Sequence, residues 1–131
     1  YRDRAPFDAA TTLGEALLTP TRIYVKRLLP LLKDDAVRGF AHITGGGLTE
    51  NVPRIYPETF AARFDDAALT LPPVFQWLME AGGVPIPEMR RTFNCGVGGA
   101  LAVRARDAER ILAALRSAGE CARVIGDIVK A

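Results

Sequence analysis

Histidine and cysteine are scarce in this chain of 131 residues. The single histidine, His42, excludes any site within the chain that needs several imidazoles. The two cysteines, Cys95 and Cys121, lack the short spacing typical of metal ligands, so we predict two buried thiols in a reducing cytosol. We therefore expect no metal site in this chain.

Long hydrophobic runs and a large charge of one sign are also missing. No apolar stretch reaches the roughly 18 residues of a membrane span, and the first residues do not open a signal peptide. The formal net charge of +2 is too small to indicate binding to nucleic acid or to an anionic membrane. These absences favour a cytoplasmic protein without nucleic-acid or membrane partners.

The length and the local patterns predict one α+β domain preceded by an arm. Residues 1–18 have weak periodicity and read as a linker or arm, and residues 19–131 form the domain. We expect a mixed β-sheet with helices packed on one face. The predicted helices cover residues 19–32 (with Pro30 kinking or splitting the helix), 48–56 (short or distorted because it contains Pro53), 72–82, 87–92 and 107–119. The predicted strands cover residues 37–44, 59–64, 97–103 and 121–129.

The most informative segment is a predicted strand that runs through His42 into three glycines and then a helix. Glycine allows positive φ and close approach of a ligand, and a helix N-terminus offers free N–H groups, so Gly45, Gly46 and Gly47 suit an anion such as phosphate. The Thr44 hydroxyl can add a hydrogen bond, and His42 can donate to a phosphate or substrate oxygen. The alternative is a tight strand-to-helix turn with a half-buried histidine. The segment matches neither a P-loop nor a dinucleotide-binding fingerprint.

A second candidate lies in residues 90–98, where two arginines, Asn94 and scattered glycines precede a strand. Asn94 can hydrogen-bond a polar ligand, and the arginines can pair with phosphate. The alternative is a solvated helix end before a glycine-weakened strand. The adjacent Asp65 and Asp66 read as a solvated turn with helix-capping character.

Four ordered motifs together resemble the C-terminal domain of AIR synthetases, the phosphoribosylformylglycinamidine cyclo-ligases. They are residues 18–26 (LTPTRIYVK), 41–54 (AHITGGGLTENVPR), 73–78 (PVFQWL) and 89–98 (MRRTFNCGVG), and the end of the chain fits as well. The resemblance covers residues 12–129, and it implies the fold of that domain.

The resemblance also implies an activity and its site. Enzymes of this family convert formylglycinamidine ribonucleotide and ATP to aminoimidazole ribonucleotide, ADP and phosphate in purine biosynthesis. By resemblance, this domain forms one wall of the cleft and is inactive alone. His42 would be catalytic, residues 44–47 with Asn51 and Asn94 would contact phosphate or substrate, and ATP and Mg²⁺ would be bound mainly by the N-terminal domain. The implied partners are that N-terminal domain, the ribonucleotide substrate and, in the full-length enzyme, a second subunit. The alternative is a phosphate- or nucleotide-binding or a structural dimerisation domain of a related ATP-dependent synthetase.

Overall fold

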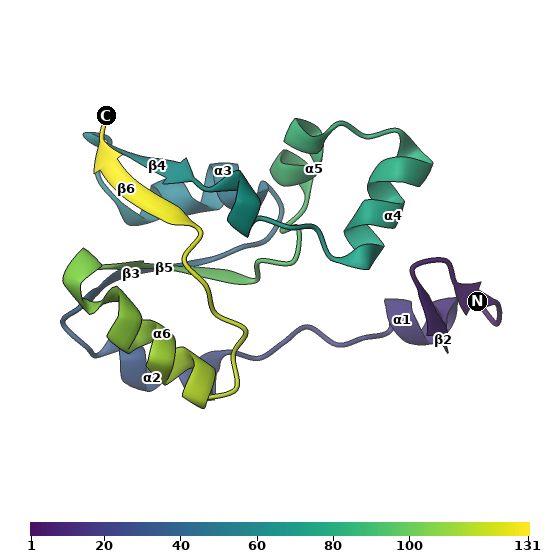
Figure 1. The fold of residues 1–131 in the computed structure, drawn as a ribbon, viewed down its shortest axis with the longest axis horizontal. Helices are drawn as coiled ribbons and strands as arrows, with labels where there is room; N and C mark the ends of the chain where they lie inside the picture. The colour runs from purple at the N-terminus through teal and green to yellow at the C-terminus, as the bar shows by residue number, and fades with distance from the viewer.

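The computed structural model describes residues 1–131, and its centre is an antiparallel pair of strands (Figure 1). β3 (Val37–His42) pairs with β5 (Gly99–Val103), and His42 at the end of β3 lies opposite Gly99 at the start of β5. Because the N–H of Ile43 donates to the carbonyl of Gly98 at 3.1 Å, the two chains stay together for one more residue. The last residues of β3 are therefore held firmly where the predicted site begins.

The α+β class is confirmed, and the strands form three two-stranded ladders. β4 (Phe60–Phe64) pairs antiparallel with β6 (Gly126–Lys130), and β1 (Arg4–Ala5) pairs antiparallel with β2 (Asp8–Thr12). The sequence suggested a single mixed sheet instead. Alternation of side chains identifies a strand but not the strand with which it pairs. The sequence alone therefore does not determine the pairing.

Two helices cover one face of the β3–β5 ladder. α2 (Val25–Leu32) and α6 (Ala108–Ser117) lie side by side below it in Figure 1. Leu28 of α2 and Ile111 and Leu112 of α6 are buried between these helices and the strands. This arrangement agrees with the expectation of helices on one face.

The other side of β3 holds the main hydrophobic cluster. α3 (Gly47–Asn51) leads directly into a 3₁₀ turn, η1 (Val52–Ile55), so the predicted helix over residues 48–56 is split, as its proline suggested. The buried residues of the cluster are Ala41, Ile43, Leu48, Val52 and Leu69. Ile43 and Leu48, the residues on either side of Thr44 and the three glycines, are therefore both buried in this cluster.

α4 (Pro73–Gly82) and α5 (Ile86–Thr92) form a pair beyond the glycine segment. α4 ends at Gly82, and the next residue, Gly83, caps it with a left-handed φ of 58°. Met89 on α5 is completely buried. Two short 3₁₀ turns, η2 (Asp66–Ala68) and η3 (Ala105–Asp107), complete the fold.

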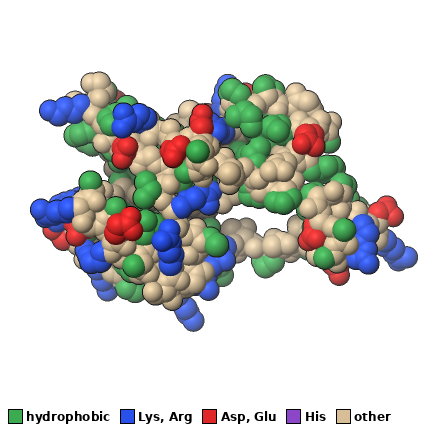
Figure 2. Space-filling view, in the orientation of Figure 1, with side chains coloured by type: hydrophobic (Ala, Val, Ile, Leu, Met, Phe, Trp, Pro, Cys, Tyr) green, Lys and Arg blue, Asp and Glu red, His purple; other side chains and the backbone are tan.

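The predicted arm has secondary structure of its own. β1, β2 and α1 (Leu13–Leu17) form a small lobe, in which Thr12 and Glu15 make reciprocal capping hydrogen bonds. Its Phe7 ring lies 5.5 Å from the Trp77 ring of α4. Figure 2 shows a thin segment that leads from this lobe to the body of the molecule, and the lobe also meets the body on the side of α4.

The segment between the lobe and α2 differs from the prediction, because α2 begins at Val25 and not at residue 19. Arg22 donates to the carbonyl of Gly119 at 2.8 Å and pairs with Glu120 at 2.9 Å, which holds residues 19–24 in an extended path toward α6. α2 then continues through Pro30 without a break. No helix of the structure combines the length and hydrophobicity needed to span a membrane.

Candidate functional site: a strand, a glycine loop and an exposed imidazole

The glycine loop, residues 44–46, presents unpaired backbone donors. The N–H groups of Thr44, Gly45 and Gly46 donate to no acceptor within the chain. Thr44 and Gly45 are exposed, and a Cβ placed on Gly45 would meet no atom within 4 Å. The loop is therefore open to solvent at Thr44 and Gly45 and carries free donors, both of which an anion site requires.

The next glycine is built into the interior instead. Gly47 is buried with φ of 56°, and its N–H donates to the carbonyl of Thr44 at 3.0 Å. A Cβ there would overlap the carbonyl of Arg90 and lie 2.7 Å from that of Phe93. Glycine at this position is required by close packing of the loop on the end of α5, and it offers no donor to a ligand.

The side chain of Asn51 holds the glycine loop in place through hydrogen bonds. Its side chain is only 4% exposed, and its Nδ2 donates to the carbonyl oxygens of Gly47 at 2.7 Å and Gly45 at 3.2 Å. Two carbonyl groups of the loop are thereby turned inward. The predicted contact between Asn51 and substrate stays a prediction, but its amide nitrogen already has two acceptors.

Asn94 occupies the turn between α5 and β5. Its Oδ1 accepts from the N–H of Gly96 at 3.0 Å, and its carbonyl accepts from the N–H of Val97 at 2.9 Å. Between them Cys95 has a left-handed φ of 49°, a conformation rare for residues other than glycine. Since Asn94 directly follows Phe93, the turn adjoins Gly47, and the structure brings the two predicted motifs together.

The two cysteines differ in their surroundings. Cys95 is half-buried, its Sγ donates to the carbonyl of Met89 at 3.4 Å, and burial raises the pKa of its thiol. Cys121 is exposed, so the expectation of two buried thiols is wrong for this residue. It lies in residues 120–125, which cross the molecule outside any strand, because β6 starts only at Gly126.

The His42 side chain is exposed, and its ring lies edge-on to that of Tyr24, with centroids 6.3 Å apart and planes at 71°. Both rings line a hollow of about 370 Å³ whose other walls are mainly apolar. His42 is therefore accessible to a ligand and flanked by an aromatic side chain that the sequence motifs did not single out. Tyr24 lies within the segment 18–26 that carried the family resemblance, which was the available signal.

Charged side chains surround the loop on one side. The carboxylate of Glu50 lies over Gly46, where a Cβ would come within 2.6 Å of its Oε2, and Arg91 is 3.9 Å from Glu50. The other predicted arginine, Arg90, pairs with Asp66 at 2.6 Å. Because Glu50 repels anions, the Thr44 and Gly45 end of the loop is the favourable end for phosphate.

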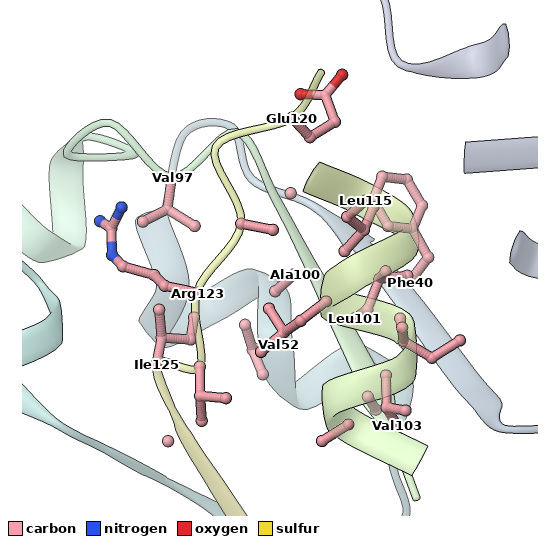
Figure 3. Close-up of a pocket in the computed structure, with 18 of the residues that line it drawn as sticks. Phe40, Val52, Val97, Ala100, Leu101, Val103, Leu115, Glu120, Arg123 and Ile125 are labelled. Atoms are coloured by element: carbon pink, nitrogen blue, oxygen red, sulfur yellow. The ribbon is translucent and has the colours of Figure 1, made fainter. Parts of the chain in front are cut away.

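A second, larger cavity of about 680 Å³ lies between β5, α6 and residues 120–128. Figure 3 shows Ile125 and Arg123 on one side and Leu101 and Leu115 on the other. Its lining is mostly hydrophobic, and its polar groups are already engaged: Glu120 pairs with two arginines, and Arg123 donates to the carbonyl of Ala68. The chain has no group of three histidine, cysteine or carboxylate side chains placed to hold a metal ion.

Fold and site together define an α+β domain in which a strand ends in an exposed imidazole and a loop of free amides. Comparison with known proteins makes the assignment specific. The family model described as AIR synthase related protein, C-terminal domain, matches residues 2–131, so the chain belongs to this family.

One curated relative is the phosphoribosylformylglycinamidine cyclo-ligase of Chromobacterium violaceum. It is 52% identical over 124 residues, which is 95% of this chain and 36% of the relative. The chain thus spans little more than a third of that relative's length.

Proposed function

We propose that this chain is the C-terminal domain of an ATP-dependent cyclo-ligase that converts formylglycinamidine ribonucleotide to aminoimidazole ribonucleotide in de novo purine biosynthesis. It forms one wall of the active-site cleft and is inactive alone. Family membership and the 52% identical relative support this activity. The observation that carries the site is the row of free, exposed amides at Thr44 and Gly45, two residues after an exposed imidazole.

The loop and the histidine have different roles in this reaction. Ring closure requires the formyl-derived oxygen to be activated, after which the amidine nitrogen attacks its carbon. The N–H groups of Thr44 and Gly45 and the Thr44 hydroxyl bind a phosphate group and balance its negative charge. His42 donates a hydrogen bond or a proton to an oxygen at the reacting centre. Asn51 and Asn94 keep the loop and the neighbouring turn in place through their bonds to the backbone.

When bound, ATP would supply the phosphoryl group that activates the formyl-derived oxygen, and Mg²⁺ would neutralise the negative charge of the phosphate groups. We assign most contacts with both to the part of the subunit outside this chain. The contribution of the chain is limited to the free amides of the glycine loop and the imidazole. This division explains why the isolated domain would not turn over substrate.

An apolar strip beside the histidine supports a docking partner within the same subunit. The strip consists of four exposed side chains, Ile23, Val25, Leu29 and Leu32. It borders the hollow that contains His42, and exposed apolar patches of this kind mark interaction surfaces. We propose that it packs against the N-terminal domain of the subunit, and that full-length subunits form a homodimer.

The proposal is tested in a chimeric subunit in which this chain replaces the matched 124 residues of the Chromobacterium violaceum relative. We expect the chimera to produce aminoimidazole ribonucleotide and the isolated chain to produce none. His42→Ala in the chimera should lower kcat/KM by a factor of about 10 to 1,000, the usual range for one positioned polar group. Ser117→Ala, at the exposed end of α6, is the matched control. Turnover by the isolated chain, or an unchanged value for His42→Ala, would contradict the proposal.

Two further measurements separate the alternatives. Tight binding of ribose phosphates to the isolated chain in calorimetry would favour a stand-alone binding module. Gly46→Val introduces a branched side chain at φ of 92° and against Glu50, so it should distort the loop and reduce the activity of the chimera. Full activity after this change would favour a purely structural domain.

A further inference from the structure

The chain itself makes no hydrogen bond to the His42 ring. Neither ring nitrogen has a side-chain or backbone partner, and the side chain is exposed. An exposed imidazole normally exchanges between rotamers within nanoseconds. The aromatic neighbour of the imidazole is the ring of Tyr24, whose centroid lies 6.3 Å from that of His42.

Tyr24 is held at its backbone. It immediately precedes α2, and its carbonyl accepts the N–H groups of Arg27 at 3.0 Å and Leu28 at 2.9 Å. The side chains of Arg22 and Arg27 both pair with Glu120 at 2.9 Å, and the Glu120 side chain is only 11% exposed. The segment that carries Tyr24 is thus fastened on both sides to the connection between α6 and β6.

The far end of the Tyr24 side chain is held as well. Its hydroxyl group lies against Gly98, where a Cβ would overlap the hydroxyl oxygen and come within 2.9 Å of Cζ. Gly98 in turn accepts the hydrogen bond from Ile43, the residue after His42. The absence of a side chain at Gly98 therefore makes room for the phenol beside the end of β3.

We propose that Tyr24 is the positioning residue for His42, and that Gly98 is glycine in order to admit the Tyr24 hydroxyl. The edge of one ring against the other restricts the orientations of the imidazole in the hollow that both rings line. This role rests on the proposed function for its catalytic consequence. The restraint itself is a property of the 131-residue chain and can be measured without the remainder of the subunit.

The single histidine makes the restraint directly observable by proton NMR. In the isolated chain, we expect nuclear Overhauser contacts between the His42 and Tyr24 ring protons and an imidazole signal displaced by the neighbouring ring. Tyr24→Phe keeps the ring and should preserve both features, whereas Tyr24→Leu should abolish the contact and move the signal toward that of an unstructured histidine. Circular dichroism establishes that each variant is folded. An imidazole signal unchanged by Tyr24→Leu would overturn the proposal.

Gly98 provides a second test through rescue. In the chimeric subunit, Gly98→Ala should displace the phenol and lower kcat by roughly 10- to 100-fold, the scale expected for a catalytic group displaced by about 1 Å, with little change in KM. Adding Tyr24→Phe removes the overlapping oxygen and should restore a large part of kcat. If Gly98 served only the backbone of the strand, removing an oxygen from residue 24 would restore nothing, and that result would also overturn the proposal.

The outcomes distinguish this proposal from the proposed function. An active chimera that is insensitive to His42→Ala, with the NMR contacts intact, would contradict the catalytic role while Tyr24 still orients the imidazole. A chimera sensitive to His42→Ala but unaffected by Tyr24→Leu would support the catalytic role and contradict positioning by Tyr24.

Discussion

The junction between the glycine loop and α3 (residues 46–51, the glycine junction) differs from the apolar strip in how far the chain buries its side chains. At the junction, Gly47, Leu48 and Asn51 are buried, and the Asn51 side chain donates to the carbonyl groups of Gly45 and Gly47. Along the strip, Ile23 and Leu29 remain exposed although they are as hydrophobic as the core residues. The buried residues of the junction pack against other parts of this chain, whereas the hydrophobic side chains of the strip remain exposed to solvent. Interior packing therefore identifies what the chain stabilises by itself, and exposed hydrophobic side chains mark the surface that we propose is covered by the N-terminal domain.

The most severe way to break the junction is to add one carbon atom at Gly47. Gly47→Ala combines a positive φ with overlap of the Arg90 carbonyl. Backbone strain of this kind costs of order 1–3 kcal/mol, and overpacking typically adds about 1–3 kcal/mol. We expect the sum to appear as a loss of unfolding free energy in urea titrations. Gly45→Ala, which meets no neighbouring atom, should have little effect, and equal losses for the two would refute the distinction between buried and open glycines.

Two adjacent leucines on α2 allow a buried and an exposed side chain to be compared within one helix. Leu28 is 6% exposed and Leu29 is 51% exposed. Truncation of a buried leucine costs about 2–5 kcal/mol, so Leu28→Ala should strongly destabilise the isolated chain. Leu29→Ala should change the unfolding free energy by less than about 0.5 kcal/mol. A large loss at Leu29 in urea titrations would mean that the strip is already covered within the chain.

Asn51 tests whether the loop depends on its internal donor. Asn51→Ala leaves the carbonyl groups of Gly45 and Gly47 without their partner, which should cost about 1–3 kcal/mol. Asn94→Ala removes one accepted hydrogen bond in a more accessible turn and should cost about 1 kcal/mol. Thermal unfolding of both variants checks the order. A smaller loss at Asn51 than at Asn94 would contradict the bracing role.

The smallest expected effect is a loss of stability at acid pH, and it comes from the ion pair between Asp34, just after α2, and Arg110. The Arg110 guanidinium lowers the pKa of Asp34 from its ordinary value of 3.8 to about 2, through bonds of 2.7 and 3.1 Å. Because the folded pKa is depressed, this stabilisation is fully present above about pH 3.8 and is lost as the pH falls through about 2. Asp34→Asn should remove this part of the pH dependence of urea unfolding. An unchanged acid profile in that variant would show that the pair contributes nothing.

Local sequence patterns predicted most elements and their order. The strands at residues 37–44 and 59–64, the helix starts at Pro73 and after Asp107, and the break near Pro53 all agree with the structure within a few residues. Such features depend on side-chain alternation, proline and capping residues, which act within one or two turns of the chain. The start of α2 was misplaced because Arg22 forms its partners with Gly119 and Glu120, far away in the sequence.

The sequence by itself determined the family, the α+β class and the position of a glycine loop after the only histidine, because these are matters of local residue type and order. Only the tertiary structure decided which glycine is open and which is buried, that Asn51 braces the loop, and that Tyr24 lies against His42. Each of these contacts requires two segments to come together. That choice is made by packing and hydrogen bonding over the whole chain, and no local pattern contains it.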